Sequence, residues 1–130
     1  MGVFDTALTC GPRLRAALLA SDEVRAKVDR IFPVTSRIDE ALPFVAFYRA
    51  GMSEDSVKSA IGPQSAIYEF QIYSETWEEG LEIADRMVET LSGIVDDAIR
   101  SIRLANATED YYDAAKAYVQ IISFTVKTRK

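Results

Sequence analysis

The stretch SAIYEFQIYSETWEEGLEIADRMVETL, residues 65–91, decides the fold class because its apolar period changes once, at residues 74–76. Before that point apolar residues alternate with others, as in a β-strand with one face in a core. After it they recur every three or four positions, as on one face of a helix. Thr76 and Glu79 have the spacing of a capping box, in which two side chains satisfy free backbone N–H groups. The stretch therefore predicts a strand that leads directly into an amphipathic helix.

The strand predicted over Ser65–Tyr73 has one apolar face and one mixed face. The apolar face carries Ala66, Tyr68, Phe70 and Ile72. The mixed face carries Ile67, Glu69, Gln71 and Tyr73. The helix predicted over Thr76–Leu91 has one apolar stripe, made of Trp77, Leu81, Ala84, Val88 and Leu91. A helix with such a stripe must bury it, and the sheet is the surface available.

Segments on either side of this stretch continue the α+β pattern. Pro12 and Ser21 are typical of helix starts, so two short helices, or one helix broken near Ser21, are predicted at the N-terminus. A brief edge strand is predicted within Asp29–Pro33. Further strands are predicted over Pro43–Arg49, Ala98–Ala107 and Ala117–Thr128, with a long excursion over Ala50–Gln64 and a polar connection over Thr108–Lys116. The predicted fold for residues 1–130 is one α+β domain, an antiparallel sheet of about four strands with helices packed on one face.

The charge balance weighs against a basic grip on nucleic acid. The 130 residues include 15 Lys and Arg and 20 Asp and Glu, for a net charge of −5. Phosphate binding needs clustered basic residues, and the dense basic run at residues 127–130 is typical of a solvated chain end. No apolar stretch approaches the roughly 20 residues of a membrane span, and the N-terminus lacks a signal-peptide pattern. We therefore expect folding in a cytoplasm-like compartment.

Residues suited to common catalytic chemistry are few. The chain has no histidine and one cysteine, Cys10, which removes the commonest general base and any Cys/His metal site. No glycine-rich phosphate loop and no nucleophile elbow is present. The acid pairs Asp96-Asp97 and Glu109-Asp110 fall in predicted polar turns, where such residues are expected. A Ca²⁺ or Mg²⁺ site there is the alternative. The sequence predicts no enzyme, no cofactor and no metal.

Apolar side chains are also predicted on the sheet face opposite the helix. They are Phe47, Ile67, Tyr73, Val119 and Ile121. One interpretation is that the N-terminal helices cover this face and make a three-layer domain. The other is that a second subunit covers part of it, because exposed apolar patches commonly mark interfaces. The five residues are thus a candidate subunit interface.

Four segments, in order along nearly the whole chain, carry a resemblance to a known family. The first is the helix Leu14-Arg15-Ala16-Ala17-Leu18-Leu19, followed by the Val24–Val28 segment and Arg30-Ile31-Phe32-Pro33. The second is Leu42-Pro43-Phe44-Val45-Ala46-Phe47, and the third is the Tyr68–Tyr73 strand that leads into the Trp77–Leu91 helix. The fourth is Glu109-Asp110-Tyr111-Tyr112-Asp113 before a strand ending Ser123-Phe124-Thr125-Val126. In this pattern the chain resembles the small tail-completion proteins (tail terminator or head–tail joining proteins) of long-tailed bacteriophages and prophages. One departure is Tyr73 before Ser74, where the family often has Trp.

The resemblance implies a structural role in a virion. Such proteins form a homo-oligomeric ring, usually a hexamer, at the head-proximal end of the tail tube. The ring ends tube growth and offers a surface to the head–tail connector protein. DNA passes through it without specific binding, which an acidic ring interior would favour. The family supplies no catalytic residues, and its location is the virion tail, with assembly in the host bacterial cytoplasm.

Two other classes of function remain open from the sequence. One is a small ligand-binding or regulatory α+β module with a pocket between helix and sheet. The other is a hydrolase that uses the Asp and Glu clusters, although no arrangement in the sequence accounts for the roughly 8–23 kcal/mol of barrier lowering that catalysis requires.

Overall fold

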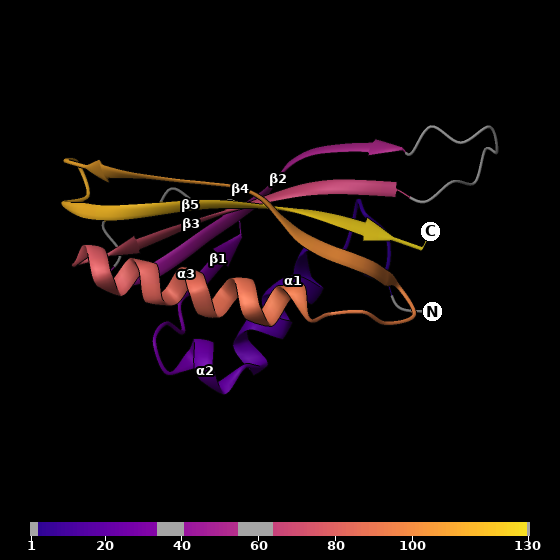
Figure 1. The fold of residues 1–130 in the computed structure, drawn as a ribbon, viewed down its shortest axis with the longest axis horizontal. Coiled ribbons are helices and arrows are strands. Elements are labelled where there is room, and N and C mark those ends of the chain that lie inside the picture. The colour runs from indigo at the N-terminus through magenta and orange to yellow at the C-terminus, as the bar shows by residue number, and fades with distance from the viewer. Residues whose placement is uncertain (1–2, 34–40, 55–63, 130) are drawn as a thin grey trace.

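The structure, a computed structural model, describes residues 3–33, 41–54 and 64–129. Within these residues the chain forms one five-stranded sheet with three helices (Figure 1). The α+β class is therefore confirmed. No helix in the described part of the chain is long and apolar enough to cross a membrane.

The sheet has the strand order β1-β2-β3-β5-β4. The strands are β1 (Ile31–Pro33), β2 (Phe44–Glu54), β3 (Gln64–Ser74), β4 (Ile99–Tyr112) and β5 (Ala117–Thr128). β1 runs parallel to β2, whereas the other neighbours are antiparallel. The prediction of about four antiparallel strands was therefore wrong in number and in direction. A three-residue strand is too short for its side-chain pattern to reveal its direction, which only its place in the sheet determines.

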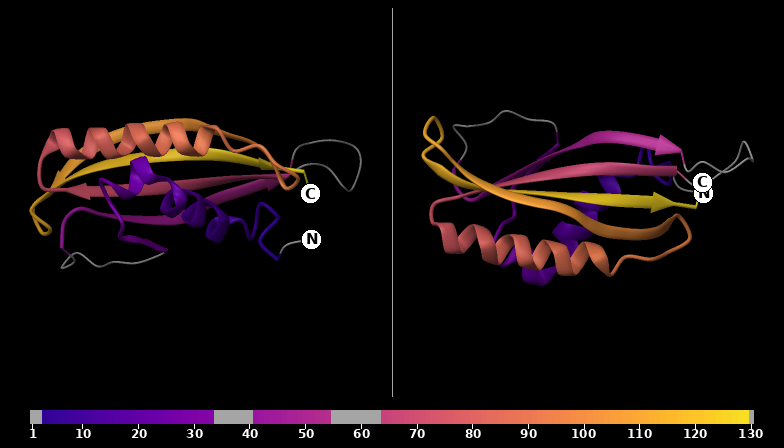
Figure 2. Two further views of the ribbon diagram at one scale, coloured as in Figure 1. Left: turned by 90° about the horizontal axis from the view of Figure 1, so that it is seen from below. Right: turned by 45° about the horizontal axis from the view of Figure 1, so that its top comes forward.

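All three helices lie on one face of the sheet, so the described chain has two layers (Figure 2). They are α1 (Gly11–Ala20), α2 (Asp22–Arg25) and α3 (Trp77–Ser92). The predicted break between the N-terminal helices is confirmed, because the Ser21 hydroxyl accepts a hydrogen bond from the Val24 N–H, 3.3 Å away, and begins α2. The N-terminal helices therefore do not cover the far face of the sheet, as one interpretation of the sequence had them do.

α3 begins as its sequence predicts. The Thr76 hydroxyl accepts a hydrogen bond from the Glu79 N–H (3.2 Å), and the Glu79 carboxylate accepts one from the Glu75 N–H (3.2 Å). Gly80 then lets the first turn lie close to the sheet. A Cβ at this position would stand 2.7 Å from the Ser74 hydroxyl oxygen and 3.3 Å from Gln120.

The face of α3 that meets the sheet differs from the predicted stripe. The buried residues are Gly80, Ile83, Ala84, Met87 and Leu91. Trp77 and Leu81, predicted to face the core, are 46% and 38% exposed. The close approach at Gly80 rotates the helix toward its Ile83–Met87 side, which leaves Trp77 and Leu81 at the edge of the packed surface.

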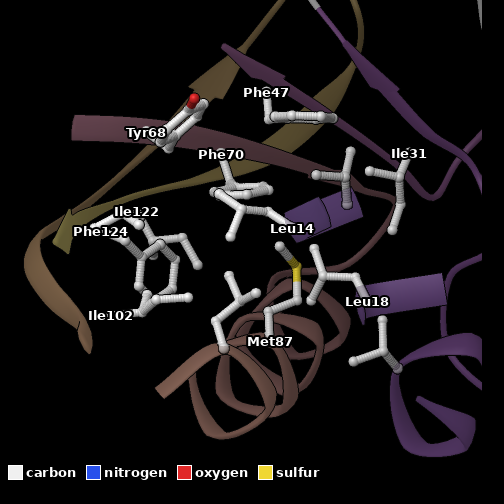
Figure 3. Close-up of a cluster of buried hydrophobic side chains, with 14 of the residues drawn as sticks. Leu14, Leu18, Ile31, Phe47, Tyr68, Phe70, Met87, Ile102, Ile122 and Phe124 are labelled. Carbon is white, nitrogen blue, oxygen red and sulfur yellow. The ribbon is translucent and has the colours of Figure 1, made fainter. Parts of the chain in front are cut away.

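The main core lies between the helices and the sheet (Figure 3). Leu14 and Leu18 of α1 and Met87 of α3 meet aromatic side chains from the central strands. Phe70 is the centre of this cluster, because its ring stacks on Phe47 at 5.1 Å and meets Phe124 edge-on at 5.7 Å. Each large, fully buried side chain of this kind contributes roughly 1.5–3 kcal/mol through removal of apolar surface from water.

Two strands extend beyond their predicted ends. β4 pairs with β5 as far as Tyr112 opposite Ala117, so the predicted polar connection Thr108–Lys116 is mostly strand. β2 pairs with β3 as far as Glu54 opposite Gln64, so only residues 55–63 of the predicted excursion remain, and these lie outside the described residues. Backbone pairing sustains such extensions without an apolar side-chain pattern, because every ladder hydrogen bond is independent of side-chain type.

Candidate assembly surfaces

Four of the five predicted interface residues lie on the far face of the sheet. Tyr73 pairs with Val119, and both belong to a cluster there together with Ile121; Ile67 is opposite Thr125 on the same face. Phe47 is the exception and a wrong prediction, because it pairs with Phe70 and packs in the main core. The run Pro43–Arg49 is apolar on both faces, so alternation alone cannot assign its sides, and pairing with β3 decides them.

Part of the far face is already buried by this chain. The Phe44 ring stacks on Tyr73 at 4.5 Å, and Tyr112 meets Tyr73 edge-on at 5.9 Å. Tyr73 and Val119 are consequently 7% and 0% exposed, and burial raises the pKa of the Tyr73 phenol. These two residues therefore contribute to a second, smaller core. A subunit role for the five residues stays a prediction.

The other end of the far face is more open. Tyr48, Met52 and Ile67 are 37%, 40% and 41% exposed, and a hollow of about 260 Å³ is lined by Met52, Ser65, Ile67 and Thr125. The Tyr48 hydroxyl donates to the Glu69 carboxylate at 2.8 Å, and this hydrogen bond raises the pKa of Tyr48. Glu69 also accepts from Gln71 at 2.9 Å. This end of the face is thus a mixed surface, with a hydrogen-bonded polar row beside apolar side chains.

A larger exposed apolar surface lies where α3 meets the β4 edge. We call it the α3–β4 strip; its members are Trp77, Leu81, Leu104, Tyr111 and Tyr118, each between 38% and 46% exposed. The Tyr111 and Tyr118 rings meet at 5.0 Å. A hollow of about 410 Å³ lies among Trp77, Glu109, Asp110, Tyr111 and Tyr118. The three aromatic members of the strip, Trp77, Tyr111 and Tyr118, therefore surround one recess.

Glu109 links Trp77 of α3 to Gln120 of β5 through hydrogen bonds. Its Oε1 atom accepts hydrogen bonds from the Gln120 amide and from the Trp77 indole, each at 3.0 Å. Those two hydrogen bonds lower the pKa of Glu109. Sequence reasoning placed Trp77 in the core and Glu109 in a turn, and so missed this site. The available signal was the width of the apolar surface on α3, where Ile83 and Met87 add to the predicted stripe.

A third hollow lies at the opposite edge, beside α1 and β2. We call it the α1–β2 hollow; it has a volume of about 840 Å³, and its lining includes Phe4, Leu8, Pro33, Phe47, Tyr48 and Tyr68. Two arginines, Arg15 and Arg49, also line it. Phe4 and Leu8 are 46% and 52% exposed, so the mouth is apolar as well as the floor.

Hydrogen bonds tie the N-terminal segment to the sheet and give the hollow its shape. The Tyr68 hydroxyl donates to the Ala7 carbonyl at 3.1 Å, and Arg49 donates to the Leu8 carbonyl at 2.8 Å. Burial raises the pKa of Tyr68 and that of the neighbouring Cys10 thiol, whose sulfur lies 3.7 Å from the Tyr68 hydroxyl. Both groups are therefore neutral at neutral pH, and Cys10 serves packing here rather than nucleophilic chemistry.

The predicted acid pairs do not come together. Asp96 lies in the turn before β4, where its Oδ1 atom accepts from the Ala98 and Ile99 N–H groups, each at 2.8 Å. Burial opposes ionisation of Asp96, but these backbone hydrogen bonds and Arg13 outweigh it and lower its pKa. Glu109 and Asp110 lie near the far end of β4, on a strand and not in the predicted turn. Within residues 3–33, 41–54 and 64–129, no group of three Cys, Asp or Glu residues is placed to hold a metal ion.

Comparison with known proteins shows a likeness of fold only. No protein-family model matches the chain, and no curated protein matches its sequence. The fold matches a chain in a solved structure described as "Virion of native gene transfer agent (GTA) particle", with a TM-score of 0.73 and 11% sequence identity. The match covers 88% of this chain and 90% of that chain. Nearly the whole fold is therefore shared with a protein that is part of a virion particle.

Proposed function

We propose that this chain is a structural protein of a phage or phage-like virion, whose copies form a ring at the head-proximal end of the tail. The observation that carries the proposal is the match of nearly the whole fold to a chain of a gene transfer agent virion, at a TM-score of 0.73. The resemblance to tail-completion proteins along the chain agrees with it. A ring of six copies, located in the virion tail, is the arrangement that the resemblance implies.

The described surface supports assembly better than catalysis. Two apolar regions, the α3–β4 strip and the α1–β2 hollow, expose large side chains such as Trp77, Tyr111 and Leu8. A monomer rarely exposes extended apolar patches without a partner for them. The acidic composition, with a net charge of −5, suits a ring through which DNA passes without sticking, since bound phosphates require clustered basic side chains.

The ring would act on two partners of the virion. On one side it would contact the last layer of tail-tube protein and stop further addition of that protein. On the other it would present a surface to the head–tail connector protein. Neither contact requires a cofactor or a covalent step.

The proposal is tested by deleting this gene from the phage or prophage that encodes it. We expect tails of irregular length that fail to join heads, and recovery of normal particles when the gene is supplied on a plasmid. Electron microscopy of lysates measures tail length and the fraction of joined heads. Tails of normal length, joined to heads in the absence of the protein, would contradict the proposed function.

A second candidate function rests on the α1–β2 hollow. Its volume of about 840 Å³ is that of a pocket for a small molecule, and Arg15 and Arg49 would suit an apolar ligand with an anionic group. Native mass spectrometry of the purified protein tests this function. A bound small molecule that dissociates from an Arg15→Ala, Arg49→Ala variant would favour the ligand-binding module over the ring subunit.

A further inference from the structure

The two apolar regions lie at opposite edges of the sheet. The strand order β1-β2-β3-β5-β4 places β2, beside the α1–β2 hollow, near one edge and β4, beside the α3–β4 strip, at the other. α1 and α3 flank these edges on the same face (Figure 2). β1 pairs with only residues 45–47 of β2, so Tyr48 and Arg49, which line the hollow, lie beyond the end of β1. A surface at each of two opposite edges is the arrangement needed for head-to-tail contact.

The charges beside the two regions have opposite signs. Arg15 and Arg49 line the hollow. Arg15 donates a hydrogen bond to the Ile31 carbonyl, and Arg49 donates one to the Leu8 carbonyl. Within residues 3–33, 41–54 and 64–129 neither arginine forms a salt bridge with a carboxylate. Their positive charges therefore remain available to an acidic partner.

The strip is bordered by acidic side chains. α3 carries five acidic residues and one basic residue in the sequence WEEGLEIADRMVETLS. Glu78 and Asp85 are exposed, and Asp85 lies two helical turns from Trp77 and one from Leu81, on the same side of α3. Asp110 lines the recess among the strip's aromatic residues. The strip is thus an apolar surface with negative charge at its border.

We propose that the α3–β4 strip of one copy docks in the α1–β2 hollow of the next copy. Trp77 and Tyr111 are the aromatic anchors that enter the hollow, and Glu78 and Asp85 meet Arg15 and Arg49. Because the two surfaces differ and lie at opposite edges, a docked pair of copies still has one strip and one hollow free for further copies. Head-to-tail contacts of this kind close into rings when the rotation between copies permits. The inference rests on the proposed function in taking a second copy of this chain as the partner.

Charge reversal of each surface separately tests this contact. The hollow variant is Arg15→Glu, Arg49→Glu, and the strip variant is Glu78→Arg, Asp85→Arg. Each variant alone places like charges against each other, so we expect self-association at least about tenfold weaker than that of the wild type. Sedimentation velocity over a range of concentrations measures it, with and without tail tubes of the same phage.

Mixing the two variants separates docking from misfolding. In the mixture, the acidic hollow of the hollow variant meets the basic strip of the strip variant. In the next contact, the unchanged strip of the hollow variant meets the unchanged hollow of the strip variant. The mixture is therefore expected to assemble, whereas neither variant assembles alone. Arg25→Glu, Lys127→Glu, at exposed positions on α2 and near the end of β5, makes the same change in net charge as the hollow variant and lies away from both surfaces. We expect this control to assemble as the wild type does.

Trp77 supplies an independent readout because it is the only tryptophan in the chain. It is 46% exposed, and docking would bury it. Its fluorescence emission is therefore expected to move to shorter wavelength as the wild type assembles, and in the mixture of variants, but not in either variant alone.

Each result either supports or overturns the inference. Rings that form equally well in the single variants, or no assembly in their mixture, would overturn the docking contact and leave the ring function intact. If the wild-type protein does not self-associate, either alone or in the presence of tail tubes, the docking contact is overturned. The tail lengths measured in the gene deletion would then decide the proposed function separately. If charge reversal does not affect assembly but a bound small molecule is lost from the hollow variant, the docking contact is overturned and the hollow is a ligand site.

Discussion

The two edges of the sheet carry different surfaces on one fold. At the β1–β2 edge the N-terminal segment folds against the strands, hydrogen bonds from Tyr68 and Arg49 hold it, and a hollow lined by two arginines results. At the other edge β4 is the outermost of the described strands, and its residues from Arg103 to Tyr111 are all exposed. One edge is recessed and basic, whereas the other presents aromatic side chains among acids. The difference shows how a small sheet can offer two unlike surfaces at once, which a ring subunit requires.

The largest loss of stability is expected from a substitution in the main core, which lies between the two edges of the sheet. Phe70→Ala removes a fully buried ring that contacts both Phe47 and Phe124. We expect a loss of about 3–5 kcal/mol in the free energy of unfolding, since such a cavity cannot close fully. Urea denaturation followed by circular dichroism measures it. A loss below about 1 kcal/mol would mean that the two halves of the core do not depend on this ring.

The packing of α3 on the sheet sets the position of the strip, and Gly80→Ala tests it. The added Cβ would stand 2.7 Å from the Ser74 hydroxyl oxygen, so the helix or Ser74 must shift. We expect a destabilisation of about 1–3 kcal/mol, typical of overpacking. Gly51→Ala is the matched control, because nothing lies within 4 Å of its Cβ position and no described glycine has a positive φ. Equal stability of the two variants, measured by urea denaturation, would contradict the close approach.

At the hollow edge, Tyr68→Phe removes the hydroxyl that donates to the Ala7 carbonyl at 3.1 Å. The carbonyl loses a buried partner, so we expect a loss of about 1 kcal/mol in unfolding free energy. Tyr111→Phe on the exposed strip serves as the control and should change stability by less than about 0.5 kcal/mol. Thermal melts of both variants give the comparison. A larger effect at Tyr111 than at Tyr68 would contradict a stabilising role for the Tyr68 hydrogen bond to Ala7.

The smallest expected effect concerns a link between the edges. Arg13 contacts Asp5 at 2.6 Å and Asp96 at 2.5 Å, which ties α1 to the start of β4. Because the pKa of Asp96 is lowered in the folded protein, its stabilisation is present above the ordinary Asp value of about 3.9 and is lost as pH falls through the lower folded pKa. Asp96 and Arg13 are both about one-third exposed, so solvent screening keeps the pair below about 1 kcal/mol.

The measurement for this link is the slope of stability against pH below pH 4. Asp96→Asn should flatten that slope, whereas Asp97→Asn, at the exposed neighbouring position, should leave it unchanged. An identical acid slope in the wild type and in Asp96→Asn would show that the Asp96 carboxylate does not contribute in the folded state.

Local signals in the sequence predicted the starts of elements well. The cap at Thr76, the break at Ser21 and the alternating faces of β3 are confirmed, because each depends on residues within a few positions of one another. Long-range features were predicted poorly. The side of Phe47 was wrong because β2 is apolar on both faces, and β4 was cut short because its outer half is held by pairing with β5 and not by apolar side chains.

The sequence by itself determined the switch from strand to helix at residues 74–76, the acidic face of α3 and the lack of histidine chemistry. Only the tertiary structure decided which side of α3 meets the sheet, because the contact at Gly80 turns Trp77 and Leu81 outward. It also decided that the arginines and the acids stand at opposite edges, since strand order arises from pairing between segments far apart in the chain. The period of apolar side chains shows which residues share one face of a helix or strand, but the whole fold determines which element packs against that face.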